Sequence, residues 1–366
     1  MLLAQDTASH KSVWAFNGYL KDLQWIRLNK DFSKPVATNL VHNRINLKWN
    51  KAEQWAGRLE IRNRLYWGGD VREQPGFKEQ LRNQSEAVNL SVNWLDTRSA
   101  ILHSNLERCW IEFKKPKWNV RAGRQRINWG ITNTWSPNDI FNSYNFLDFD
   151  YEERPGSDAI KTQYLLNELS HLELAVAGTR NKPIIAANYF TNYRQYDLQA
   201  NSGFYQGNFT AGLGWAGNIK EAGFKGEAQF HGSKKDGLSN LLVVLEGDYM
   251  FKNGWYVSTT FLFNDKGWDS PLDSLNTLVF QVSPRNLMPT KWNFLVNTSK
   301  EITPILSGSM SVVYAPGTNL LILFPTLRYN VQTNLDLDFV WQSFFASSSG
   351  FEALSHIGFL RAKWSF

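Results

Sequence analysis

The sequence predicts an all-β fold, a transmembrane antiparallel β-barrel of 16–18 strands, with 18 as the best count. Three observations predict it. The 366-residue chain is rich in aromatic side chains, with 16 Trp, 13 Tyr and 24 Phe. Polar and apolar residues alternate with a period of two in many segments. The last of these alternating segments runs to the final residue.

The aromatic content favours a membrane barrel over a soluble protein. Trp and Tyr rings concentrate at the two membrane interfaces, where barrels carry aromatic girdles. Mean hydropathy is only −0.39, and the most apolar runs are as short as Leu241–Leu245 and Leu320–Phe324. A spanning helix needs about 20 apolar residues. A spanning strand needs only every second residue to be apolar, so a barrel remains compatible with low mean hydropathy.

The alternation supplies about eighteen strand candidates, at a spacing that suits a strand of roughly ten residues plus a connection. Residues 53–67 illustrate it, because Leu59 and Ile61 fall on one face while Arg58 and Glu60 fall on the other. The candidates are 12–28, 38–49, 53–67, 85–95, 99–113, 117–128, 158–167, 170–179, 186–197, 204–217, 220–231, 240–251, 254–264, 291–300, 304–315, 319–331, 333–344 and 354–366.

The two ends of the chain place the barrel in the bacterial outer membrane. Residues 1–10 are interpreted as a signal-peptide remnant and N-terminal tail, with cleavage before Gln5; an ordinary cytoplasmic start is the alternative. Residues 11–366 form a single barrel domain. The last segment carries Gly358, Trp364 and Phe366 on one face. It resembles the terminal strand signal of outer-membrane barrels, which implies recognition by the barrel-insertion machinery.

Basic residues concentrate in the first third of the chain. Residues 1–130 hold 22 Lys and Arg against 12 Asp and Glu, on alternating strand positions that predict a lumenal wall. Unpaired, these cations would attract anions. Paired with Glu60, Glu107, Glu112 and the acids of 148–153, they would only fill the barrel, and both interpretations are open. The predicted pore-lining residues are Arg44, Lys48, Arg58, Arg62, Arg64, Arg121, Arg124 and Arg126.

A short motif carries a family resemblance. The run Gly123-Arg124-Gln125, followed by Trp129-Gly130, resembles Gram-negative porin-like barrels of the alginate-export and phosphate-porin type. In those barrels a Gly-Arg-Gln strand leads into a long loop, which implies lumenal positions for Arg124 and Gln125. Strict alternation would instead turn Arg124 toward lipid, so we expect either a bulge at Gly123, the preferred solution, or a position at the rim.

The long connection 129–157 is a candidate constriction or plug. In an eighteen-strand count it follows the sixth strand, on the side where connections are short. Either the count is wrong by one, or the segment folds into the lumen and faces Arg121, Arg124 or Arg126. A packed loop, a constriction and a Ca²⁺ site are its three possible roles. The candidate constriction residues are Asp148, Asp150, Glu152 and Glu153.

These features predict a passive porin-like channel for small polar, anionic solutes. The alternative is a non-transporting barrel that serves as a structural subunit of an outer-membrane assembly, with a closed lumen. We expect no enzymatic activity, catalytic residues, metal, cofactor or nucleic-acid partner, because no Ser–His arrangement or ligand cluster has suitable spacing. Expected partners are outer-membrane lipids, the insertion machinery, small solutes and other outer-membrane proteins.

Overall fold

The computed structural model describes residues 13–81, 86–143, 145–150, 154–233, 239–271, 282–347 and 350–366. The predicted signal-peptide remnant and tail, residues 1–10, lie outside this range. So do two of the predicted constriction residues, Glu152 and Glu153. Among the described residues, no helix is long and apolar enough to cross a membrane.

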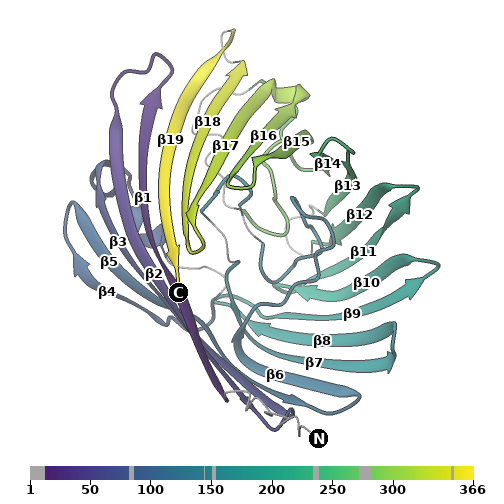
Figure 1. Cartoon of the computed structure of the whole chain (residues 1–366). Helices are drawn as coiled ribbons and strands as arrows, with labels where there is room; N and C mark the ends of the chain where they lie inside the picture. Colours follow the sequence, from purple (N-terminus) through teal and green to yellow (C-terminus); the bar gives the residue numbers. More distant parts are fainter. Residues whose placement is uncertain are drawn as a thin grey trace, which may run out of the picture.

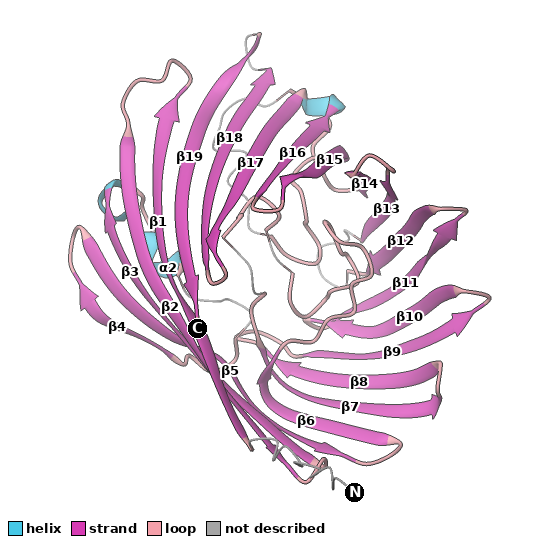
Figure 2. Cartoon of the chain, in the orientation of Figure 1, coloured by secondary structure: helices cyan, strands magenta, loops and turns pink. Residues whose placement is uncertain are grey.

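Strands build the whole wall, and the described helices are short and lie in the connections between strands (Figure 2). The helices are α1 (Gly69–Glu73), α2 (Phe77–Gln80) and the 3₁₀ turn η2 (Pro316–Thr318). The strands are β1 (Trp14–Asn29), β2 (Val36–Lys51), β3 (Trp55–Gly68), β4 (Ser91–Asp96), β5 (Ala100–Lys114), β6 (Trp118–Gln125), β7 (Ser157–Asn167), β8 (Ser170–Gly178), β9 (Ile184–Tyr193), β10 (Tyr196–Tyr205), β11 (Asn208–Ile219), β12 (Ala222–His231), β13 (Asn240–Met250), β14 (Trp255–Asn264), β15 (Trp292–Thr303), β16 (Leu306–Ala315), β17 (Leu320–Gln332), β18 (Leu335–Ser347) and β19 (Phe351–Ser365).

The strands close into an antiparallel barrel (Figure 1). Each strand pairs with its sequence neighbours except at β4, which pairs only with β5, while β3 pairs directly with β5. Of the nineteen described strands, the eighteen other than β4 therefore form the circuit, which β1 and β19 close. The predicted all-β fold and the count of 18 are confirmed.

Two errors in the predicted strand list cancelled. Residues 85–95 include β4, which is not a member of the circuit, and β10 was missed because 186–197 merged β9 with the turn at Arg194-Gln195. Both turn residues have positive φ. Gly or Asn at these positions would have indicated a turn in the sequence, whereas Arg and Gln do not. With β4 removed, β6 is the fifth strand of the circuit. Residues 129–157 then lie on the same side as the other long connections. The expectation that they follow a strand on the side of the short connections was therefore wrong.

The barrel has a turn side and a loop side. Both ends of the sheet meet on the turn side, where Gly18 and Phe366 exchange two backbone hydrogen bonds. A ring of aromatic contacts marks this level, including Trp55–Phe113 and Trp118–Tyr164. On β3 the next exterior tryptophan is Trp67, at the loop side. The two β3 tryptophans are about 40 Å apart along the strand at about 3.3 Å per residue, which spans the hydrocarbon layer once strand tilt is included.

The C-terminal strand closes the barrel as its alternation predicts. Trp364 pairs with Leu20, and Phe366 stacks on Phe16 at 5.9 Å between ring centroids. Gly18 is required beneath this ring, because a Cβ there would lie 2.8 Å from Phe366. Gly358 similarly makes room for the Trp341 ring. Closure satisfies the edge hydrogen bonds that lipid could not.

Candidate functional site

The long connection between β6 and β7 runs inside the barrel, and we call residues 129–157 the lumenal segment (Figure 1). Its first contacts are with inward side chains of β8 and β10. The indole N–H of Trp129 donates to Glu173, and the Gln199 amide donates to the carbonyl oxygen of Trp129 at 2.6 Å. The segment therefore leaves the wall immediately after β6 and turns inward.

Glu227 of β12 is the principal anchor of the lumenal segment. Its carboxylate is fully buried and accepts hydrogen bonds from the backbone N–H groups of Ile131, Thr132 and Asn138, as well as from the Thr132 hydroxyl. The neighbouring strand repeats the arrangement, since Glu246 accepts from the backbone and side-chain amides of Asn133 at 2.9 and 2.7 Å. Two wall carboxylates thus hold one turn of the segment.

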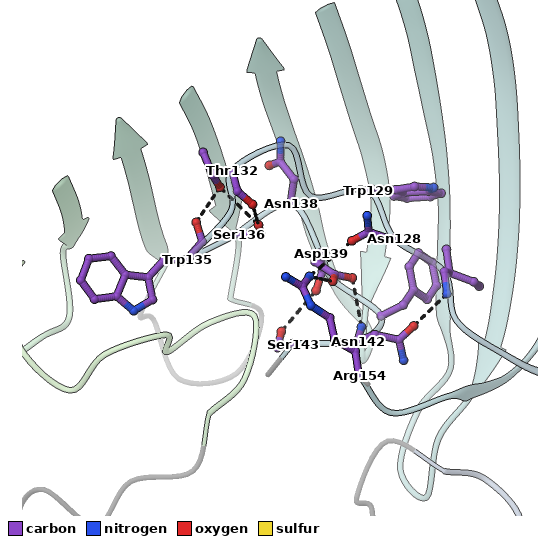
Figure 3. A network of polar contacts seen from close by, with 12 residues as sticks. Asn128, Trp129, Thr132, Trp135, Ser136, Asn138, Asp139, Asn142, Ser143 and Arg154 are labelled. Atoms are coloured by element: carbon purple, nitrogen blue, oxygen red, sulfur yellow. Dashed lines mark hydrogen bonds and ion pairs between the residues drawn. The ribbon is translucent and has the colours of Figure 1, made fainter. Parts of the chain in front are cut away.

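Within the segment, polar contacts fix the local shape (Figure 3). The Thr132 hydroxyl oxygen lies 2.6 Å from the carbonyl oxygen of Trp135 and 2.9 Å from Glu227, so its single hydrogen is shared between these two acceptors. Arg154 forms a 2.7 Å ion pair with Asp139, and the Asn142 N–H donates to the same carboxylate at 3.3 Å. Burial of Asp139 raises the pKa of its carboxyl despite the opposing charge of Arg154. The segment is therefore internally braced rather than held only by the wall.

The loop-side part of the inner face of β13–β17 is apolar, and the segment covers it. The turn-side part carries polar side chains such as Ser299, Ser309 and Arg328 around a second cavity of about 740 Å³. Trp135, 2% exposed, packs into a cluster with inward residues of these strands. Phe146 extends the contact toward Phe324 at 6.3 Å between centroids. Leu287 and Met288, from the β14–β15 connection, complete the packing. The remaining wall members of this cluster include Leu242, Val244, Leu262, Leu295, Val313 and Ile322.

Further along, the segment reaches the closure of the barrel at β19, β1 and β2. Asp150 forms ion pairs with Lys21 at 3.1 Å and Arg361 at 3.0 Å, and lies 3.3 Å from the imidazole of His42. Burial alone would raise the pKa of Asp150, but the His42 hydrogen bond and the surrounding cations hold it well below its usual range. The adjacent ring of Phe149 packs on Phe359.

A cavity of about 330 Å³ lies between this part of the segment and the wall. Arg62 and Arg64 line it on the β3 side, and Asp148 and Asp150 line it on the segment side. Asp148 is exposed to this cavity, and desolvation by the surrounding protein together with the charge of Asp150 raises the pKa of Asp148 to about 6. Opposed charges across a narrow space create a transverse field that can sort solutes. Aromatic and apolar residues complete the lining, among them Trp25, Tyr66, Phe77 and Phe149.

The predicted basic wall exists, but most of its arginines have carboxylate partners. Arg44 and Arg58 share Glu60, Arg62 pairs with Glu107 at 2.6 Å, and Arg121 pairs with Glu112 at 2.6 Å. Of the two interpretations open from the sequence, the structure therefore shows paired arginines. Arg64 contacts Tyr66 and the Leu81 carbonyl oxygen. Lys48 has no ion-pair partner within the part of the chain that the structure describes.

Arg124 lies in the wall itself. Its guanidinium, 2% exposed, pairs with Asp158 and donates to the carbonyl oxygens of Leu106 and Val88, so it seals the wall where β6 ends. The expected bulge at Gly123 was wrong. The β5–β6 register is continuous there, Gly123 has φ 114°, and the irregularity lies on β5, where the β3–β5 register skips Glu107.

The segment meets part of the predicted basic strand, because the charge of Arg126 acts on Asp139 and Gly156 lies against the side chain of Arg124. Asp150, however, meets Lys21, His42 and Arg361, which were not predicted as its partners. Closure of the barrel explains this, because it brings the C-terminal Arg361 beside the first strand. Alternation with Gly358 and Trp364 puts Arg361 on the inward face of the last strand, but Arg361 was not among the predicted pore-lining residues, and neither were the anchors Glu227 and Glu246.

The described acids are too dispersed for a metal site. Asp139, Asp150 and Asp158 each pair with a different cation. Among the described residues, no group of three or more His, Cys, Asp or Glu side chains could hold an ion. The Ca²⁺ alternative therefore gains no support from Asp139, Asp148, Asp150 or Asp158, while Glu152 and Glu153 lie outside the description.

No protein-family model matches the sequence, and neither does any curated protein sequence. The chain is similar in structure to OccAB4 of Acinetobacter baumannii, with 8% identity, a TM-score of 0.62 and coverage of 98% of this chain and 99% of that one. It is also similar to OccK7 (OpdD) of Pseudomonas aeruginosa, with 9% identity, a TM-score of 0.61 and coverage of 96% and 98%.

A third similar structure is the outer membrane protein OprD from Pseudomonas aeruginosa, with 10% identity, a TM-score of 0.62 and coverage of 96% of this chain and 93% of OprD. The chain thus has the fold of Gram-negative outer-membrane porins, and the predicted porin-like barrel is confirmed at the level of fold. The finer assignment to the alginate-export and phosphate-porin type stays a prediction.

Proposed function

We propose that this chain resides in the bacterial outer membrane and is a passive channel for small polar, anionic solutes, which pass along the inner wall formed by β1–β6 and β19. The observation that carries the proposal is the excess of cations on that wall. Two of the described carboxylates that face this wall each serve two cations, since Glu60 is shared by Arg44 and Arg58 and Asp150 of the segment by Lys21 and Arg361.

The excess matters because a low-dielectric lumen focuses the field of unbalanced charge and raises the local concentration of counter-ions. Lys48 and Arg64 add cations without a described carboxylate partner within ion-pair distance. The loop-side part of the β13–β17 face, which is apolar and covered by the segment, offers anions nothing comparable. Solutes would therefore follow the charged side and pass the cavity between Arg62, Arg64 and the segment acids.

One observation favours the alternative, a non-transporting structural barrel. The lumenal segment crosses the interior and buries Trp135 against a dry cluster, as a permanent closure would require. Under this alternative the segment is a plug, and the cations serve only to hold its acids.

Single-channel recording in planar bilayers separates the two functions. As a porin, the wild-type barrel conducts and prefers Cl⁻ over K⁺, and replacing residues 148–153 with a neutral linker raises conductance and strengthens the anion preference, because acids are lost and cations remain. As a structural barrel, the wild type is nearly silent and the same replacement opens it. A conducting wild type with cation preference would contradict the anion proposal.

We also propose that the terminal strand, with Gly358, Trp364 and Phe366, is the signal that the barrel-insertion machinery reads. Its exterior alternation and the closure contacts of Phe366 support this. Deleting Phe366 should sharply reduce the yield of heat-modifiable, folded barrel in the outer membrane, while Phe351→Ala at the other end of β19 should not. Equal yields of folded barrel from the two variants would contradict the proposal.

A further inference from the structure

The exterior of the barrel is not uniformly apolar between its two tryptophan levels. On β1, β2, β3 and β5, the outward positions at mid-height carry amide, hydroxyl and carboxylate side chains. Asn43 pairs in register with Leu20 and Asn63, and Asn63 pairs with Ser104. Because register partners share a face, these side chains lie on the exterior with the exposed Leu20. We call Asp22, Gln24, Asn39, Asn43, Asn63 and Ser104 the polar exterior patch.

The height of the patch is fixed by its own strands. On β3, Asn63 lies between the exterior tryptophans Trp55 and Trp67. On β1, Asp22 lies above the level of Trp364, which pairs with Leu20, and below Ile26, which pairs with Gly358 beside Trp341. Asn39 pairs with Trp67 and with Gln24, so these two amides lie at the loop-side tryptophan level. The other members of the patch therefore sit where acyl chains cover a porin, and Gln24 and Asn39 lie at the upper boundary of that layer. Acyl chains offer no hydrogen bonds, so polar groups there need partners from protein.

Some polar side chains of the patch hydrogen-bond to one another. The Asn63 amide donates to Asn43 at 2.9 Å, the Ser104 hydroxyl donates to Asn63, and the indole of Trp94 donates to Ser104 at 2.8 Å. This row crosses four strands and ends at β4. The other members do not join it, because Asp22 and Gln24 are exposed and have no hydrogen-bond partner among the described residues.

Two features beside the polar exterior patch enlarge the surface that a partner could contact. Beside Gln24 and Asn39, an exterior groove of about 280 Å³ lies over Gly358, with Trp341 and Leu360 at its sides. At the other end, β4 pairs on one edge only, so its second edge has no strand partner within the described sheet, and Trp94 is 70% exposed. On the far wall, exposed exterior positions include the apolar side chains Val176 and Leu213, and Thr259 on β14 is an isolated hydroxyl between apolar outward neighbours.

We propose that this surface docks another outer-membrane protein, whose membrane-embedded face brings hydrogen-bonding side chains and one Lys or Arg opposite Asp22. The negative charge of Asp22 favours such a partner over a second copy of this chain. Within the described strands, no exposed Lys or Arg lies on the exterior between the tryptophan levels, because Lys300 sits beside Trp255 at the turn side and Arg124 is sealed in the wall. Two copies would meet with Asp22 uncompensated.

Photo-crosslinking in the native host tests the proposal, whether or not the lumen conducts. A photoreactive side chain replaces Val41, which pairs with Asp22, or Leu213 as the control on the far wall. We expect one heavier species from position 41 and none from 213. The triple variant Asp22→Leu, Asn43→Leu, Asn63→Leu should reduce its yield about tenfold, whereas Thr259→Leu, an exposed exterior change on β14, should not.

The decisive arm is charge reversal. Asp22→Lys should abolish the crosslink, and replacing the partner's Lys or Arg in the crosslinked peptide with Asp should restore it. Heat-modifiable mobility verifies that each variant folds. If the triple variant does not assemble, Asp22→Asn replaces it in the comparison. A product with the mass of two copies of this chain, adducts to lipid alone, equal products at both positions, or no rescue would each overturn the proposal.

Discussion

The two halves of the inner wall are built in opposite ways. The face of β1–β6 and β19 carries paired charges around a cavity, while the loop-side part of the β13–β17 face is dry and packed against Trp135. One segment, residues 129–157, serves both faces with different chemistry. The comparison teaches that the barrel does not enclose one uniform lumen. The segment closes one side by hydrophobic packing and leaves the other side to ionic contacts, which water can enter.

The largest expected effect is on the dry side. Trp135→Ala removes a nearly fully buried indole, and large-to-small changes of this kind cost about 3–5 kcal/mol. Urea unfolding of the folded barrel in detergent measures the loss. Phe351→Ala, an exposed position, is the control and should cost less than about 1 kcal/mol. Equal losses at the two positions would mean that the dry cluster does not hold the segment.

On the charged side, breaking one pair should also destabilise the barrel. Arg62→Leu leaves the buried Glu107 without its 2.6 Å partner, and an unpaired buried charge costs about 3 kcal/mol or more. The double variant Arg62→Leu, Glu107→Leu should recover most of that loss in the same urea titration. If the single variant is as stable as the wild type, the pairs are solvated and the two halves differ less than the structure indicates.

The anchor Glu227 allows a local test. Glu227→Leu removes the acceptor for three backbone N–H groups of the segment, and a buried donor left unsatisfied costs about 1–3 kcal/mol. Hydrogen exchange at residues 131–138 should accelerate by at least about tenfold, with little change in the strands. Glu301→Leu, the loss of an exposed carboxylate on β15, is the control. Unchanged exchange would show that the dry cluster alone holds the segment.

The smallest expected effect depends on pH. Desolvation by the surrounding protein and the charge of Asp150 raise the pKa of Asp148 to about 6, so lowering the pH from 7.5 to 5 protonates Asp148 and removes one negative charge. Anion preference should therefore rise modestly as pH falls, as measured by the reversal potential in a salt gradient. Asp148→Asn should show the stronger anion preference at both pH values. An identical pH response in the variant would assign the titration elsewhere.

The sequence predicted the wall better than the interior. Strict alternation placed Arg58, Glu60, Arg62 and Arg64 on the inner face of β3, because strand geometry leaves no other choice. It could not place Asp150 beside Arg361, because that contact depends on closure between the first and last strands and on a segment without periodicity. It also could not reveal that Gln125 and Arg124 are both buried, since the end of β6 breaks the alternation on which the prediction rested.

Cysteine accessibility tests the central contrast most directly. In a Cys109→Ser background, Lys48→Cys places a thiol on the charged wall and Val244→Cys places one in the dry cluster. We predict that an anionic, water-soluble thiol reagent lowers single-channel current through the Lys48→Cys barrel and leaves the Val244→Cys barrel unchanged. Current block at position 244, or an unaltered current after complete modification at position 48, would contradict a solute path along the charged side.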